Sequence, residues 1–178
     1  MKAIVIYGTR WGGTVTIAEK IGHTLKDEGF IVDVVDAQQR HQNVDAYDLV
    51  IIGSGIRADK WTKGTLRFFE KNAPLLRTKK IALFVSCQMA DGGKEDQDKA
   101  KHKYLEKTAE NYGLKPVAFG FFGGFLDFNH SHGLLVDVLV RVNRNSLRRN
   151  GLDISKVCDT RDWVLIEAWA REVAKTVP

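Results

Sequence analysis

The chain opens with MKAIVIYGTRWGGTVTIAE (residues 1–19), in which a short apolar run breaks at a loop rich in glycine and threonine (residues 8–14). Apolar residues recur at helical spacing after that loop, so the stretch predicts a buried strand, a loop and a helix. Such a loop places backbone N–H groups at a helix N-terminus, where the helix dipole favours an anion. Three hydroxyls add further polar groups there, those of Thr9, Thr14 and Thr16.

The spacing of this loop narrows the class of phosphate ligand. No lysine follows Gly13, so the G-x-x-x-x-G-K-[ST] motif of nucleoside triphosphate sites is not met. The spacing G-x-G-x-x-G is also missing, which disfavours a dinucleotide. The loop suits a single phosphomonoester, such as that of FMN. The alternative is a plain strand-to-helix turn, with Thr14 or Thr16 as the helix cap.

Length and composition are those of a globular domain. The chain has 178 residues, 44% hydrophobic and 28% charged, which predicts one domain over residues 1–178 with a full hydrophobic core. Its two cysteines, Cys87 and Cys158, suggest neither a disulfide framework nor a zinc site. We find no twenty-residue apolar stretch and no signal-peptide pattern, so we expect a cytoplasmic protein. The net charge of +5 is modest, and the aromatic residues are not interleaved with basic ones, which disfavours nucleic-acid binding.

Strand and helix patterns alternate along the chain. The strand candidates are continuous apolar runs, as expected for parallel strands covered on both faces. We therefore expect an α/β fold, a doubly wound five-stranded parallel sheet in three α/β/α layers. The predicted strands are Ala3–Tyr7, Phe30–Val35, Leu49–Ile52, Ile81–Ser86 and Val117–Phe122, and the predicted helices are Thr14–Glu28, Thr62–Asn72, Lys94–Tyr112, Gly133–Arg149 and Thr160–Lys175.

Glycine, proline and short polar residues mark the expected helix ends. Gly29 and Gly113 stand where C-terminal caps belong, and Pro74 is expected to follow the second helix. Asp159 or Thr160 is expected to cap the last one.

Ligands of such sheets lie beyond the carboxyl ends of the strands, so the loops after the first, third and fourth strands should carry function. In the loop after the third strand, Gly53 and Gly55 allow close approach of a flat ligand. Arg57 or Lys60 could meet developing negative charge. Trp61 could stack on a ring, or it could cover the helix that follows, and the structural role is favoured at least as much as stacking.

The remaining reactive side chains give weaker signals. Gln88 and backbone N–H groups after the fourth strand could contact the polar edge of a ring. Cys87 is expected to be a small core residue rather than a nucleophile. His130 and His132, with Asp127 as the third candidate ligand, are expected to lie in a solvated loop rather than bind a metal. A response-regulator function is excluded, because residues 52–54 are Ile-Gly-Ser where an acceptor aspartate is required.

With these loops placed, the chain resembles a flavodoxin-type FMN domain over nearly its whole length. The loop of residues 9–14, TRWGGT, is similar to the flavodoxin phosphate loop T-x-x-G-x-T. The segment 50–57, VIIGSGIR, resembles V-I-G-A-S-I-R of the menaquinone-dependent protoporphyrinogen IX dehydrogenases (oxidases) of haem biosynthesis. The ending DTRDW (159–163) with WAREVA (169–174) resembles their T-D-W…F-A-R-E-I-A. This chain and that family also share an extra basic segment after the fifth strand, here about residues 125–150.

This resemblance implies non-covalent FMN, two-electron oxidation of a small-molecule or tetrapyrrole substrate such as protoporphyrinogen IX, and a quinone acceptor. No side chain is assigned as a catalytic acid or base, because the redox chemistry belongs to the flavin. The oligomeric state is left open. The implied FMN-binding residues are Thr9, Arg10, Trp11, Gly12, Gly13 and Thr14 at the phosphate, and Ser54, Gly55, Ile56, Arg57, Trp61, Ser86, Cys87, Gln88, Met89 and Gly92 around the ring.

Local charge separates an enzyme from an electron carrier. The expected ring loop carries Arg57, Lys60 and Lys63 against Asp59, and net positive charge stabilises reduced flavin, which favours two-electron uptake. The two alternatives are a flavodoxin electron carrier and a flavin-free binding or regulatory module.

The predicted helix after the fifth strand is apolar first and basic later. It could lie at the inner surface of an anionic membrane, close to a lipid quinone, or it could be a core helix with a solvated basic end. Its basic residues are Arg141, Arg144, Arg148 and Arg149.

Overall fold

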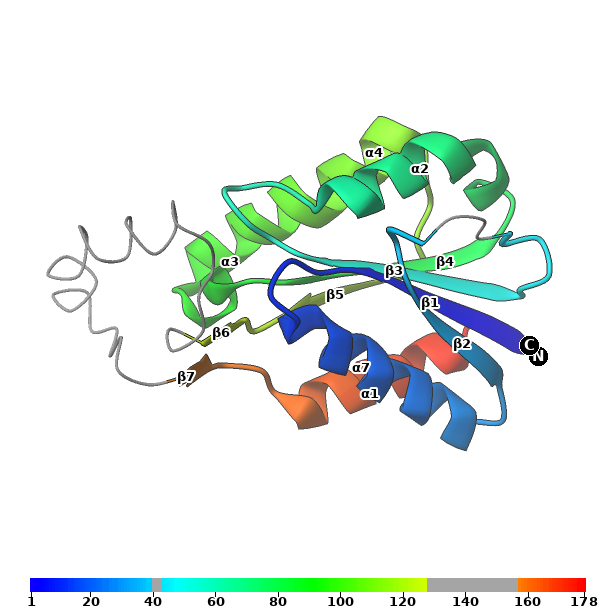
Figure 1. Cartoon of the computed structure of the whole chain (residues 1–178), viewed down its shortest axis with the longest axis horizontal. Helices are drawn as coiled ribbons and strands as arrows, with labels where there is room; N and C mark the ends of the chain where they lie inside the picture. Colours follow the sequence, from blue (N-terminus) through cyan, green and yellow to red (C-terminus); the bar gives the residue numbers. More distant parts are fainter. Residues whose placement is uncertain (40–42, 128–156) are drawn as a thin grey trace, which may run out of the picture.

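The computed structural model describes residues 1–39, 43–127 and 157–178 (Figure 1). Its main sheet is parallel throughout, in the order β2-β1-β3-β4-β5, which confirms the predicted five-stranded α/β fold. Because the first strand lies inside the sheet, the chain winds outward in both directions from it. The strands are β1 (Lys2–Gly8), β2 (Ile31–Asp36), β3 (Leu49–Gly55), β4 (Lys80–Ser86) and β5 (Ala118–Phe122).

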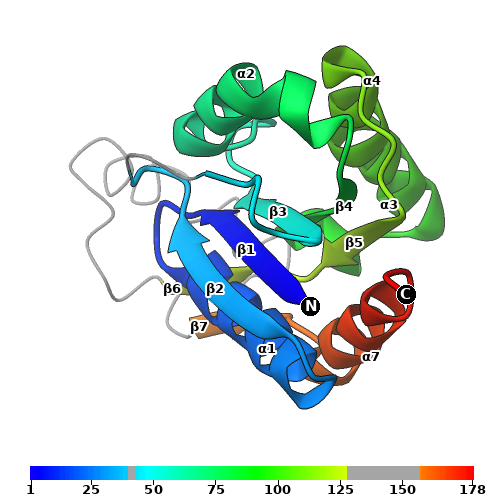
Figure 2. The ribbon, with the colours of Figure 1, turned by 90° about the vertical axis from the view of Figure 1, so that its right-hand side faces the viewer.

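Helices cover both faces of this sheet, as Figure 2 shows. On one face lie α1 (Gly13–Asp27) and α7 (Trp163–Ala174). On the other lie α2 (Lys63–Leu76), α3 (Lys94–Lys101) and α4 (Lys107–Tyr112), the last two joined by a π-helical turn at His102–Glu106. A 3-10 turn, Gln88–Asp91, follows β4.

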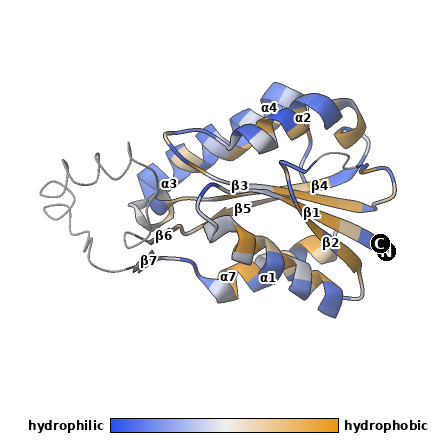
Figure 3. Ribbon diagram, in the orientation of Figure 1, coloured by the Kyte–Doolittle hydropathy of each residue, from blue (hydrophilic) through white to orange (hydrophobic). Residues whose placement is uncertain are grey.

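Two hydrophobic clusters fill the spaces between the layers, because successive side chains of each strand point to opposite faces. In β3, Val50 and Ile52 belong to the cluster under α2, whereas Leu49 and Ile51 belong to the cluster under α1 and α7. All four side chains are fully buried. Figure 3 shows the same arrangement as apolar strands between helices that are apolar on their inner faces.

Several predicted boundaries need correction. Pro74 lies inside α2 instead of after it, because the helix continues to Leu76. The cap of α7 is Asp162, whose carboxylate accepts from the Leu165 N–H at 3.0 Å, so the expected caps two or three residues earlier are wrong. The predicted caps at Gly29 and Gly113 are confirmed by their φ angles of +87° and +64°.

A short antiparallel pair at the carboxyl edge was not predicted. It joins β6 (Phe125–Asp127) to β7 (Val157–Asp159), two three-residue strands far apart in the sequence. Runs this short carry no recognisable period. The predicted helix Gly133–Arg149, with its four arginines, and the two histidines at 130 and 132 lie outside the described residues.

Replacing Gly53 by Ala should destabilise the fold by about 3 kcal/mol, at the upper end of typical overpacking effects. A Cβ at this position would lie 2.0 Å from Cζ of Phe84, a fully buried ring with no room to move. Urea unfolding measures the change. Gly93→Ala is the control, because no atom lies within 4 Å of the added Cβ, and it should lower stability by less than about 1 kcal/mol.

Candidate functional site

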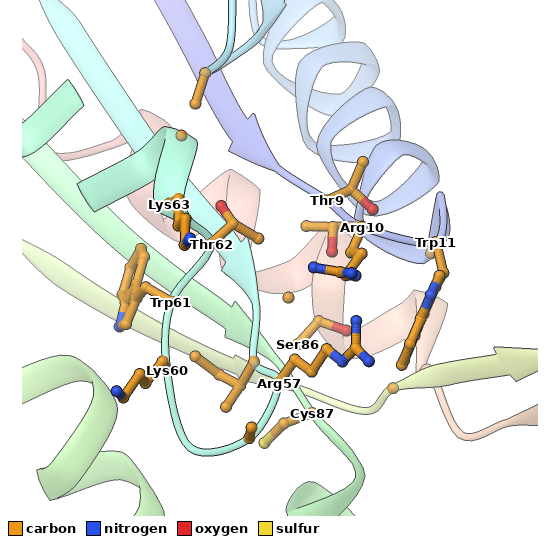
Figure 4. Close-up of a pocket in the computed structure, with 18 of the residues that line it drawn as sticks. Thr9, Arg10, Trp11, Arg57, Lys60, Trp61, Thr62, Lys63, Ser86 and Cys87 are labelled. Atoms are coloured by element: carbon orange, nitrogen blue, oxygen red, sulfur yellow. The ribbon is translucent and has the colours of Figure 1, made fainter. Parts of the chain in front are cut away.

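Loops from the carboxyl ends of all five strands of the main sheet surround one cavity of about 890 Å³, a size typical of cofactor sites (Figure 4). Twelve of the sixteen residues assigned to FMN from the sequence line it. They are Thr9, Arg10, Trp11, Gly13, Thr14, Gly55, Ile56, Arg57, Trp61, Ser86, Cys87 and Gln88. Gly12, Ser54 and Gly92 do not line it, and the side chain of Met89 is not among those that the structure describes.

The first loop presents an uncapped helix end to this cavity. Helix α1 begins at Gly13 with no side-chain cap at its N-terminus and no acidic residue in its first turn. Gly12 has a φ of +84°, a conformation that favours glycine, and its N–H donates to Thr9 Oγ1 at 2.9 Å. Neither Thr14 nor Thr16 caps the helix, so the caps expected from the sequence are wrong. The arrangement suits an anion.

The hydroxyls of this loop differ in their availability. Thr14 is buried, and its Oγ1 lies where a Cβ on Gly55 would come within 2.9 Å, so it stands between the first and second loops. The Thr16 hydroxyl donates to Gly13 O at 3.3 Å and does not line the cavity. Thr9 and Thr14 are therefore the two threonines of this loop that line the cavity.

The loop after β3 is fixed to its neighbours at both ends. Ser54 is fully buried and its Oγ accepts from the Thr62 N–H at 3.0 Å, so its role is structural. Ile56 N–H donates to Ser86 O, which ties this loop to β4. Between them, Arg57 and Lys60 close a tight turn through two backbone hydrogen bonds of 3.0 Å.

The tip of this turn is held in a strained conformation. Ala58 and Asp59 have positive φ angles, +45° and +62°, which L-residues rarely adopt. The Tyr104 hydroxyl donates to Asp59, and Lys103 Nζ lies 2.9 Å from the same carboxylate. These contacts lower the pKa of Asp59, the hydrogen bond from Tyr104 contributing most. The pKa of Tyr104 is raised, first by burial and then by Asp59. The one acidic group of the turn is therefore held by the π-helical turn between α3 and α4 and does not line the cavity.

The two tryptophans at the cavity have different environments. Trp61 is 6% exposed, donates its Nε1–H to Tyr104 O at 2.7 Å and packs edge-on against Phe69. It thus belongs to the core under α2, although part of it reaches the cavity. Trp11 is half-buried, and the Arg57 guanidinium lies 4.5 Å from its ring centroid. The packing favours the structural reading of Trp61.

The end of β4 and the loop after it contribute Ser86, Cys87 and Gln88 to the lining of the cavity. Ser86 Oγ donates to Gly123 O at 2.8 Å, and Cys87 N–H donates to Phe122 O. Cys87 is 7% exposed and packs in the core, as its sequence position predicts. Among the described residues, no cluster of His, Cys, Asp and Glu could hold a metal ion.

Sequence reasoning missed three parts of the lining. They are Ala37 and Gln38 after β2, Gly64 and Arg67 in the first turns of α2, and Gly124 with Phe125 after β5. The parallel order of the strands could have pointed to the loops after β2 and β5, because all five strands end at one edge. The helical residues gave no such signal.

The cavity is strongly cationic. Its lining holds five basic side chains and no carboxylate: Arg10, Arg57, Lys60, Lys63 and Arg67. Within the part of the chain that the structure describes, none of the five forms an ion pair, whereas other lysines and arginines do. The pKa of Arg57 is lowered, first by burial and then by the charge of Arg10. Figure 4 shows Arg10, Arg57 and Trp11 on one side, with Lys60, Trp61 and Lys63 opposite.

Comparison with known proteins agrees with this geometry. The flavodoxin-domain family model matches residues 4–132, so the chain belongs to the flavodoxin-domain family. Two curated relatives are named protoporphyrinogen IX dehydrogenase [quinone]. The one from Escherichia coli (strain K12) is 24% identical over 98% of this chain and 95% of its own length. The one from Leishmania major is 24% identical over 97% of this chain and 74% of its own length. The resemblance drawn from the sequence motifs is thereby confirmed.

Solved structures show the same fold. A short-chain flavodoxin associated with a PDU bacterial microcompartment has a TM-score of 0.61 at 13% identity, covering 100% of this chain and 99% of that one. A flavodoxin from the domain Archaea has a TM-score of 0.59 at 15% identity, covering 99% of both chains. No helix in the described part of this chain is long and apolar enough to cross a membrane.

Replacing Trp61 by Phe should lower the free energy of unfolding by about 1–2 kcal/mol, because the buried hydrogen bond from Trp61 Nε1 to Tyr104 O is lost. Trp11→Phe should change it by less than about 0.5 kcal/mol, since that ring is half-exposed. Urea unfolding of the flavin-free protein measures both. Equal losses in the two variants would contradict the structural role of Trp61.

Proposed function

We propose that this protein is an FMN-dependent oxidoreductase that takes two electrons from an anionic organic substrate and passes them to a quinone. The observation that carries the proposal is the cavity with five basic side chains and no carboxylate. The flavodoxin-domain membership supports a flavin, and the names of the curated relatives support this reaction class.

The residues present fit FMN. The uncapped N-terminus of α1, with Thr9, Arg10, Trp11, Gly12, Gly13 and Thr14 around it, suits the phosphate. Gly55, Ile56 and Arg57 from one loop and Ser86, Cys87 and Gln88 from the other would flank the ring. Gly92, although off the lining, would support the second loop, as Ser54 supports the first, and Met89 remains a proposed contact of the ring. Bound FMN would supply the redox chemistry, so no side chain is needed as acid or base.

The surplus of positive charge supports an anionic substrate. A phosphate at the first loop would bring about two negative charges against the five basic groups of the lining, so a surplus of positive charge would remain. Lys60 and Lys63 lie on the side of the cavity opposite Arg10 (Figure 4). Guanidinium and ammonium groups without carboxylate partners suit the carboxylates of a substrate. Protoporphyrinogen IX, whose propionates meet this requirement, is therefore the leading candidate, and a quinone is the proposed acceptor.

An anaerobic reductive titration of the FMN-loaded protein should bleach the visible spectrum in one two-electron stage, because the cationic cavity stabilises reduced flavin. Addition of protoporphyrinogen with a soluble quinone should then give turnover. Two separate one-electron stages would favour a flavodoxin electron carrier. No uptake of FMN would leave a flavin-free binding module that has kept the fold.

Replacing Arg57 by Gln should lower the two-electron midpoint potential of the flavin, because the reduced form loses roughly 1 kcal/mol of electrostatic stabilisation. The matched control is Lys175→Gln, at the C-terminal end of α7, where the lysine pairs with Glu172 and does not line the cavity. Spectroelectrochemistry at two salt concentrations measures both potentials. An unchanged potential in the Arg57 variant would contradict the charge argument.

A further inference from the structure

Arg161, in the segment between β7 and α7, contacts the start of α1 from the far end of the sequence. Its Nη1 donates to Gly13 O at 3.1 Å and to Thr16 Oγ1 at 2.6 Å. Its Nε and Nη2 donate to the two carboxylate oxygens of Asp159, at 2.7 and 2.6 Å. The guanidinium therefore joins the last strand to the residues that open the first helix.

This guanidinium is buried in a way that fixes its position. The Arg161 side chain is 8% exposed, and its guanidinium carbon lies 4.5 Å from the ring centroid of Phe125 and 4.6 Å from that of Trp163. Two aromatic contacts and a bidentate carboxylate compensate for the lost hydration. The pKa of Asp159 is lowered, mainly by its hydrogen bond from Arg161, so the pair is charged at neutral pH.

The loop of residues 9–14 has one side-chain hydrogen bond within it among those described, from the Gly12 N–H to Thr9 Oγ1. Gly12 and Gly13 stand at its end, and α1 begins without a side-chain cap. The loop meets the β6–β7 pair on its outer side, where a Cβ on Gly13 would come within 2.9 Å of Phe125 Cβ. Phe125 and Arg161 thus form a wall behind the loop, and Phe125 also lines the cavity.

Attachment of α7 does not require these contacts. Helix α7 already packs on α1 through buried apolar residues, and Lys20 pairs with Glu167 between the two helices. Four of the hydrogen-bond donors of Arg161 are instead divided between Asp159 and the first turn of α1. Because these bonds reach the residues that open α1, they fix the conformation of the loop before the helix and are not needed to attach α7.

We propose that Arg161 is a positioning residue for the phosphate end of the flavin site, an inference that rests on the proposed binding of FMN. It holds Gly13 and Thr16 so that the uncapped end of α1 faces the cavity before the ligand arrives. In a preformed site, binding does not have to order a glycine-rich loop. The entropy cost of binding is then smaller and the affinity is higher. Because only the phosphate reaches this loop, the effect belongs to the phosphate and not to the ring.

The test compares FMN with riboflavin, which lacks the phosphate, by quenching of flavin fluorescence. Arg161→Gln should weaken FMN binding at least tenfold and change riboflavin binding by less than twofold. Arg161→Lys should also weaken FMN binding, because one ammonium group cannot reach Gly13, Thr16 and Asp159 together. The control is Arg171→Gln on α7, which removes ion pairs to Glu28 and Glu167 and should leave both affinities unchanged.

Hydrogen exchange on the flavin-free protein gives a second readout. Amides of residues 12–16 should exchange faster in Arg161→Gln than in the parent, with the sheet amides unchanged. Should Arg161→Gln fail to fold, Thr16→Val removes the hydroxyl's contacts with Arg161 and with Gly13 O at an exposed position and should weaken FMN binding selectively.

Equal losses of FMN and riboflavin affinity, or no loss of either together with unchanged exchange, would overturn the positioning role. A parent protein that binds neither flavin would count against the proposed function instead. In that case the exchange of residues 12–16 still decides whether Arg161 orders the loop.

Discussion

The burial of β1 and β3 side by side in the middle of a parallel sheet is the constraint on which the rest of the structure depends. Each strand contributes fully buried apolar side chains to both faces, so the sheet must be covered on both sides. Parallel pairing then sends every strand toward one edge, and five loops converge there. The cavity is the direct result, since its lining comes from segments that follow all five strands of the main sheet.

Charge at this edge is arranged by contacts outside the cavity. Asp59 is the one acidic residue within the turn between Arg57 and Lys60, yet Tyr104 and Lys103 hold its carboxylate. The lining keeps five basic groups without a compensating carboxylate. Such a site suits ligands that bring negative charge with them, a phosphate at one end and carboxylates at the other. This charge distribution is the basis on which we propose an oxidoreductase instead of an electron carrier.

Much of the fold could be predicted from the sequence, because apolar periodicity reports burial directly. The five strands of the main sheet were found within three residues at either end, and the caps at Gly29 and Gly113 were correct. The errors fell where local signals compete. Pro74 was expected to follow α2, but a proline near the end of a helix removes only one hydrogen bond and can be tolerated there. Asp162 was missed because Asp159 and Thr160 offered equally good caps in the sequence.

The sequence by itself determined the glycine-rich loop, the helix behind it and the loops after β3 and β4, because these depend on neighbouring residues. The tertiary structure decided which residues from distant parts of the sequence contact those loops. It placed Trp61 in the core through a hydrogen bond to Tyr104, added Arg67 and Gln38 to the lining, and set Arg161 against Gly13. These contacts join residues up to 148 positions apart, and no local pattern encodes them, since they depend on where the packed layers bring distant segments together.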